Sequence, residues 1–342
     1  MKKLAIVIGA AVLLAGIASA GVVKATKSEI TFKGFGTFRL EQTETIGGQR
    51  RLGNMNSEFK GKGLLGGLAA KTILRPGQID EIYDLPGRTI YQITPKRKEY
   101  TSQAIESWAE TQKKALAGGD EKAPAEKTES DVKIVRSEFK VEDTGEARTF
   151  GAFPCRKYQV LWTVDWENVK TGEKGSDRLV TAVWTTPPND ETRKALAEEA
   201  AFYKSYMAAV GLNSEKLSQD VLGTQWMAVL GSFDPAGGGS RPAGPDAAAV
   251  AREMKKIEGY PIVTDGQYFP APRAQAAQAE EKGGGGLGGA LGKLGAGLMK
   301  KKPDPAQEKA PALAFYTEVL SLSVRAVDES AFRVPEGFKK KN

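Results

Sequence analysis

FGAFPCRKYQVLWTVDW, residues 150–166, is the segment with the clearest structural pattern in this chain. After an opening turn marked by glycine and proline, large apolar and polar side chains alternate strictly. Because side chains of a strand alternate between its faces, five large apolar side chains share one face. They are Tyr158, Val160, Trp162, Val164 and Trp166. Such a face must be covered, either by helices of the same chain as ordinary core or by a ligand in a cavity.

The segment that follows supplies candidates for this cover. Leu179 to Thr186 predicts a second strand, which brings Trp184 to the same sheet. Pro187 to Asp190 then ends the strand and caps a helix. In that helix, apolar residues recur at spacings of three and four between Leu196 and Val210, and Tyr203 and Met207 lie in this stripe. A stripe of this width predicts a helix that packs on the aromatic face.

Other strands are expected on either side. Ile30 to Thr45 reads as one long strand, in which Gly34 and Gly36 indicate a bulge or strong curvature. Ile79 to Ile93 reads as a hairpin with its turn at Pro86-Gly87. Leu313 to Val327 is expected to be a long closing strand.

The N-terminal residues 1–20 have the pattern of a secretory signal peptide. Lys2 and Lys3 precede an apolar run from Leu4 to Ile17, and Ala18-Ser19-Ala20 forms a small-residue cleavage site. We therefore expect cleavage after Ala20 and a periplasmic or secreted mature protein without an integral membrane span.

Composition restricts the classes of function. The formal net charge of +7 is spread along the chain, and no basic run interleaved with aromatic residues indicates nucleic acid. The chain has no histidine, which removes the commonest general base and metal ligand. Its single cysteine, Cys155, excludes an internal disulfide, so we read it as a small buried apolar residue, with a reactive thiol or an intermolecular disulfide as the alternatives.

Several stretches together resemble the LolA-like superfamily of secreted bacterial proteins, which includes the periplasmic lipoprotein carriers. The stretches are Ile90-Tyr91 through Pro95–Lys98 to Tyr100, Phe153–Tyr158, Val183-Trp184 before Pro187, and Val334–Phe338. The resemblance implies an α+β fold, in which a curved antiparallel sheet forms an incomplete barrel covered by several helices. In the carriers, the concave apolar face holds acyl chains.

The domain organisation expected on this basis is a signal peptide at residues 1–20 and a single LolA-like half-barrel domain at 21–342. Residues 189–258 are interpreted as a helical insertion. Residues 270–312 are interpreted as a flexible insertion, since nine of the fifteen residues in 283–297 are glycine and so many glycines oppose a stable helix.

These expectations lead to a non-enzymatic periplasmic protein that binds a lipid or other apolar ligand in the concave face of its sheet. The alternative is a structural or sensory module of the cell envelope with a filled core and no ligand. The candidate ligand-binding residues are Tyr158, Val160, Trp162, Val164, Trp166, Trp184, Tyr203 and Met207. No catalytic residue, metal site or cofactor is predicted. The expected partners are a lipid or lipoprotein acyl chain and an envelope protein, but no nucleic acid.

Overall fold

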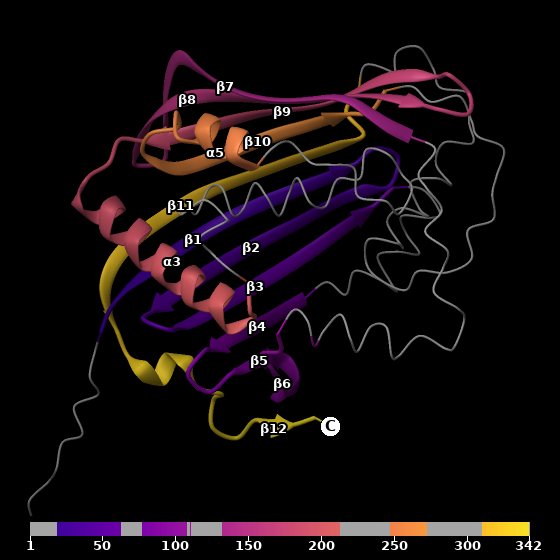
Figure 1. The fold of residues 1–342 in the computed structure, drawn as a ribbon. Helices are drawn as coiled ribbons and strands as arrows, with labels where there is room; N and C mark the ends of the chain where they lie inside the picture. Colours follow the sequence, from indigo (N-terminus) through magenta and orange to yellow (C-terminus); the bar gives the residue numbers. More distant parts are fainter. Residues whose placement is uncertain are drawn as a thin grey trace, which may run out of the picture.

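The computed structural model describes residues 19–62, 77–107, 110, 132–212, 247–271 and 310–341. These residues form one twelve-stranded sheet (Figure 1). Its strands in spatial order are β12 (Lys339–Lys340), β6 (Glu99–Ala104), β5 (Thr89–Thr94), β4 (Gly77–Asp84), β3 (Arg50–Gly61), β2 (Gly36–Gly47), β1 (Ser19–Phe32), β11 (Leu313–Val327), β10 (Tyr260–Phe269), β9 (Lys174–Thr186), β8 (Phe153–Asn168) and β7 (Val132–Phe150).

The sheet consists of two runs of consecutive strands that β11 joins in the middle. β1 to β6 follow one another from the middle of the sheet toward one edge, where the short β12 is added, and β7 to β10 run from the other edge back to the middle. β11 pairs with both β10 and β1 and so joins the two halves. All neighbouring pairs are antiparallel except the short pair of β12 with β6.

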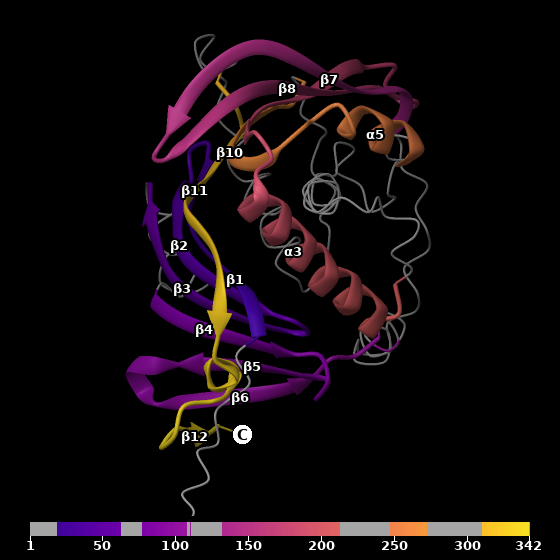
Figure 2. The same ribbon diagram turned by 90° about the vertical axis from the view of Figure 1, so that its left-hand side faces the viewer.

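Helix α3 (Asp190–Ala209) and helix α5 (Ala247–Met254) both lie on the concave side of the curved sheet (Figure 2). α3 begins where it was predicted, because Asn189 caps it: its side chain accepts a hydrogen bond from the Thr192 amide, and the Thr192 hydroxyl accepts one from the Asn189 amide. Two short 3-10 helices, η1 (Pro95–Arg97) and η2 (Glu329–Phe332), complete the described elements.

The predicted α+β fold with an incomplete barrel covered by several helices is wrong. Strands dominate the described part of the chain, and their single sheet stays open, with β12 and β7 as its two edges. The described α-helices are only α3 and the eight-residue α5, which are too few to cover twelve strands. Residues 213–246, about half of the first predicted insertion, and residues 272–309, most of the second, lie outside the described residues.

The single long strand expected over Ile30 to Thr45 is also wrong. The chain turns between β1 and β2, and the two strands pair as a hairpin. Gly34 and Gly36 have φ values of 76° and 146°, which favour glycine over residues with a side chain. The two glycines therefore mark a turn, and β1 extends back to Ser19. By contrast, the predicted bounds of the closing strand, Leu313 to Val327, are confirmed.

Candidate functional site

The alternation along β8 produces the buried face that the sequence predicts. Its five apolar side chains on one face, Tyr158, Val160, Trp162, Val164 and Trp166, are all at most 6% exposed. Four of them, Tyr158 to Val164, pack in one cluster with Val250, Met254 and Ile257, on and just after α5. The element over this face is therefore α5, and not the Leu196–Val210 helix that the sequence suggested.

Trp166 is fixed at the end of this face by a buried carboxylate. Its indole Nε1 donates a hydrogen bond of 3.1 Å to Oδ1 of Asp177, which is 2% exposed. The Ala271 amide donates to the same oxygen at 2.8 Å, and the Tyr268 hydroxyl donates to Oδ2 at 3.0 Å. Three neutral donors thus satisfy one buried carboxylate.

The remaining candidate residues lie elsewhere. Trp184 pairs with Lys157 across β8 and β9, so it lies on the face of the sheet opposite Tyr158. There its ring meets that of Phe150 edge to face, with centroids 5.2 Å apart. Tyr203 and Met207 are half-buried on α3, and the hydroxyl of Tyr203 donates to Glu44 of β2. The structure therefore divides the eight predicted residues among three environments.

Sequence reasoning missed a buried charged network between α3 and the sheet. Lys24 of β1 pairs with Glu44 of β2 at 3.2 Å and with Glu199 of α3. Arg51 of β3 also pairs with Glu44. The Tyr260 hydroxyl of β10 donates to Glu199 at 2.9 Å. The one indication in the sequence is spacing: Lys24 lies on the buried face of β1, and Glu199 lies on the buried face of α3.

Electrostatics hold Lys24 and Glu44 in their charged forms. Burial alone would lower the pKa of Lys24, but the charge of Glu199, with that of Glu44, raises this pKa well above its ordinary value. Burial opposes ionisation of Glu44, yet Lys24 and Arg51 lower its pKa. Burial and the neighbouring Glu44 raise the pKa of Tyr203 to about 12. Each carboxylate of the network has a cationic partner, so the ion pairs hold α3 against the sheet.

A row of side chains crosses the concave face from the part covered by α5 to the far half of the sheet. We call it the concave row: Val160, Thr181, Gly266, Phe315, Ile30, Phe38 and Phe59, each paired with the next across neighbouring strands. Val160 is buried, whereas Phe315, Ile30 and Phe38 are half-buried. Within the described chain, Ile30 and Phe38 belong to neither of the clusters that α5 and α3 form with the sheet.

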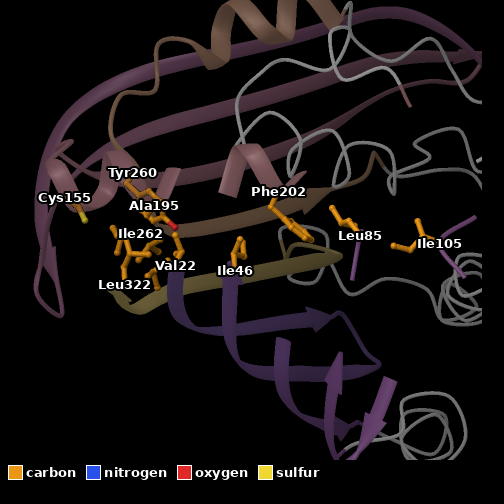
Figure 3. Close-up of a cluster of buried hydrophobic side chains, with 12 residues drawn as sticks. Val22, Ile46, Leu85, Ile105, Cys155, Ala195, Phe202, Tyr260, Ile262 and Leu322 are labelled. Carbon is orange, nitrogen blue, oxygen red and sulfur yellow. The ribbon is translucent and has the colours of Figure 1, made fainter. Parts of the chain in front are cut away.

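The second cluster, drawn in Figure 3, shows how α3 closes its own part of the sheet. Phe202 and Ala195 of α3 face Ile46, Val22 and their neighbours on the strands. Cys155 is in the same cluster, is 5% exposed, and is confirmed as a buried apolar residue.

Comparison of the chain with protein-family models, with curated proteins and with solved structures found no match. Among the described residues, no group of three or more histidine, cysteine, aspartate or glutamate side chains is arranged to hold a metal ion. Neither described helix has the length and apolar character needed to cross a membrane.

Proposed function

We propose that this chain is an exported, non-enzymatic protein of the cell envelope that binds a lipid or another apolar ligand on the concave face of its sheet. The observation that carries the proposal is the concave row. Its half-buried members, Phe315, Ile30 and Phe38, lie between the part that α5 covers at Val160 and the buried Phe59. The resemblance to the LolA-like carriers points to the same kind of ligand.

The dimensions and energetics of the row suit an acyl chain. From Phe315 to Phe59 the row crosses three gaps between strands, about 14 Å at roughly 4.8 Å per gap. Each methylene buried there contributes about 0.8 kcal/mol, so six methylenes contribute about 5 kcal/mol before ordering costs are subtracted. At Gly266 the ring of Phe315 occupies the space that a side chain would take.

The test is to extract and measure lipid from protein purified after export. We expect Phe38→Gln to retain at most a third of the lipid that the unaltered protein retains, because it places an amide in the row. Arg39→Gln is the matched control, since Arg39 is exposed on the opposite face of β2, where it pairs with Glu29. Both variants should melt like the unaltered protein. Absence of lipid from the unaltered protein, or equal lipid in Phe38→Gln, would contradict the proposal.

Export can be tested separately. We expect N-terminal sequencing of the exported protein to read GVVKA, starting at Gly21. In the structure, β1 pairs with β11 throughout Gly21 to Phe32, so cleavage after Ala20 keeps all but the first two residues of β1. A mature start well beyond Ala25 would remove paired strand and would contradict the predicted cleavage site.

One observation favours the alternative, a structural or sensory envelope module. Trp162 and Val160 are 6% and 1% exposed beneath α5, so this part of the concave face is filled core. If the lipid assay finds no ligand and the Phe38→Gln variant is less stable than the Arg39→Gln control, the whole concave row is core, and the structural module becomes the better description.

A further inference from the structure

A hollow of about 500 Å³ opens on the convex face of the sheet, opposite α3 and α5. We call it the outer hollow, and the side chains that matter for its chemistry are Arg148, Phe150, Trp184, Asp265, Tyr316 and Glu318. Its floor belongs to β9, β10 and β11, where Asp265 pairs with Tyr316 in register. Its wall is the end of the β7–β8 hairpin, residues 148–151. The volume is within the range of small-molecule sites.

The hairpin reaches over the floor because β7 is irregular. Its register with β8 shifts between Asp143 and Ala147, which adds residues to β7 and bends the hairpin. Glu146, in this bulge, forms an ion pair of 3.0 Å with Lys157 of β8. Lys157 in turn lies 5.7 Å from the ring centroid of Trp184. The wall is thus attached to the floor at one side of the hollow.

Two of the charges around the hollow are neutralised by neighbours. Glu318 pairs with Lys27 at 2.8 Å and accepts a hydrogen bond from the Tyr316 hydroxyl. Lys157 pairs with Glu146, as described above. These pairs leave one cation and one anion that form no ion pair with another described residue, namely Arg148 and Asp265.

Both of these charges face the hollow. The Arg148 guanidinium lies 4.8 Å from the ring centroid of Phe150. Burial raises the pKa of Glu318, but its hydrogen bonds with Lys27 and Tyr316 and then the charges of Lys27 and Arg148 lower it. Partial burial raises the pKa of Asp265 despite the nearby Lys157. A ligand with one charge would be attracted by one of these two groups and repelled by the other. A ligand that carries both a negative and a positive charge can pair with Arg148 and Asp265 at the same time.

We propose that the outer hollow binds a phosphate–ammonium zwitterion, with the phosphate at Arg148 and the ammonium at Asp265. A planar guanidinium suits phosphate because it can donate two parallel hydrogen bonds. The ammonium gains a second contact from the ring of Tyr316, which pairs with Asp265 across β10 and β11, since aromatic faces attract cations. The source of this group is either a phospholipid headgroup or a free small molecule. The inference uses the face opposite the concave row, so it stands or falls independently of the proposed function.

Titration calorimetry of the full mature chain with O-phosphoethanolamine tests the proposal. Because Arg148 and Asp265 are exposed, we expect a dissociation constant on the order of 1 mM. Inorganic phosphate alone and ethylamine alone should bind at least tenfold more weakly. Arg148→Gln should lose at least tenfold in affinity. Asp265→Asn should bind inorganic phosphate and O-phosphoethanolamine equally. Arg136→Gln, an exposed arginine elsewhere on β7, is the matched control and should bind like the unaltered protein.

Sedimentation with phosphatidylethanolamine vesicles distinguishes the two sources. Vesicle binding that is lost in both Arg148→Gln and Asp265→Asn supports the headgroup, and binding of the free compound without vesicle binding supports a small molecule. The proposal is overturned if neither probe binds at ten times the expected dissociation constant, or if both variants bind as the Arg136→Gln control does.

Discussion

The hydroxyl of Tyr260 on β10 donates a hydrogen bond of 2.9 Å to Oε1 of Glu199 on α3, at a point where both residues are buried. The same carboxylate pairs with Lys24 of β1, so one side chain of the helix is held from two strands. α3 therefore docks through a charged contact as well as through the apolar Phe202. This contact fixes the position of α3 on the sheet, because shifting the helix would leave a buried charge without its partner, which is costly.

Replacing Glu199 tests this attachment. We expect Glu199→Gln to lower the free energy of unfolding by about 2–3 kcal/mol, because Lys24 stays buried with one carboxylate partner fewer. Glu198→Gln, one residue earlier and half-exposed, is the control and should change stability by less than about 0.5 kcal/mol. Urea titration followed by circular dichroism measures both. A double variant Lys24→Met/Glu199→Met should lose less than the sum of the single changes, and additivity would show that the pair is not coupled.

The pH dependence of stability follows from the same network. The pKa of Glu44 is lowered in the folded protein, so its contribution is present above its ordinary pKa of 4.5 and is lost as the pH falls through the folded value. The pKa of Lys24 is raised, so its contribution is present below 10.5 and is lost as the pH rises through the folded value. We expect urea midpoints to fall below about pH 4.5, and to fall less steeply in Glu44→Gln. An equally steep acid limb in Glu44→Gln would contradict this.

The sequence predicts individual strands better than their assembly. The alternation in Tyr158–Trp166 sets the buried face of β8 without further information, because the period of two is visible locally. Trp184 shows what is missing. Hydrophobicity places its ring in the core, but the pairing of β9 with β8 points Leu179 and Val183 inward and Trp184 outward. The phase of a strand depends on its register, which a single sequence does not contain.

The charged network was missed for a related reason. Lys24, Glu44 and Arg51 lie in segments where charged residues of a strand are normally read as the solvent-facing set. They are buried only because α3 brings Glu199 to them from a position 175 residues away in the chain. The alternation of the sequence also predicts the first strand only from Ile30, whereas β1 begins at Ser19. The incomplete barrel was implied by the resemblance to the LolA-like superfamily, whereas the structure has one open sheet with β12 and β7 at its edges.

Gly266 of β10 has a specific packing role that can be tested. A Cβ atom at this position would overlap the ring of Phe315, which lies across it from β11. We expect Gly266→Ala to lower the free energy of unfolding by about 1–3 kcal/mol. Gly53→Ala on β3 is the control, because its Cβ would lie 3.5 Å from Gln42, an ordinary contact. In a Phe315→Ala background the cost of Gly266→Ala should nearly vanish, and an unchanged cost would exclude the ring as its cause.

Cys155 is expected to be unreactive in the folded protein. It is 5% exposed, and burial raises the pKa of its thiol to about 11, so little of the reactive thiolate is present near neutral pH. We expect Ellman's reagent at pH 8 to react at least a hundredfold more slowly with the native protein than with protein in guanidinium chloride. Because Cys155 is the only cysteine, the absorbance reports on this residue alone. Equal rates in the two conditions would show that the thiol is accessible.

Asp177 is expected to be one of the most sensitive single positions in the sheet. Its carboxylate accepts hydrogen bonds from Trp166, Tyr268 and the Ala271 amide, and it is 2% exposed. Asp177→Ala leaves three donors, two of them buried, without this acceptor, so we expect the free energy of unfolding to fall by about 3 kcal/mol. Asp177→Asn keeps one oxygen but turns a donor toward its neighbours, and we expect a loss of about 1–2 kcal/mol. Asp165→Asn, half-exposed on the opposite face of β8, is the control and should leave the free energy of unfolding nearly unchanged.

Near-ultraviolet circular dichroism should change for Asp177→Ala as Trp166 loses its fixed orientation. An unaltered spectrum together with unaltered stability would contradict the role assigned to Asp177.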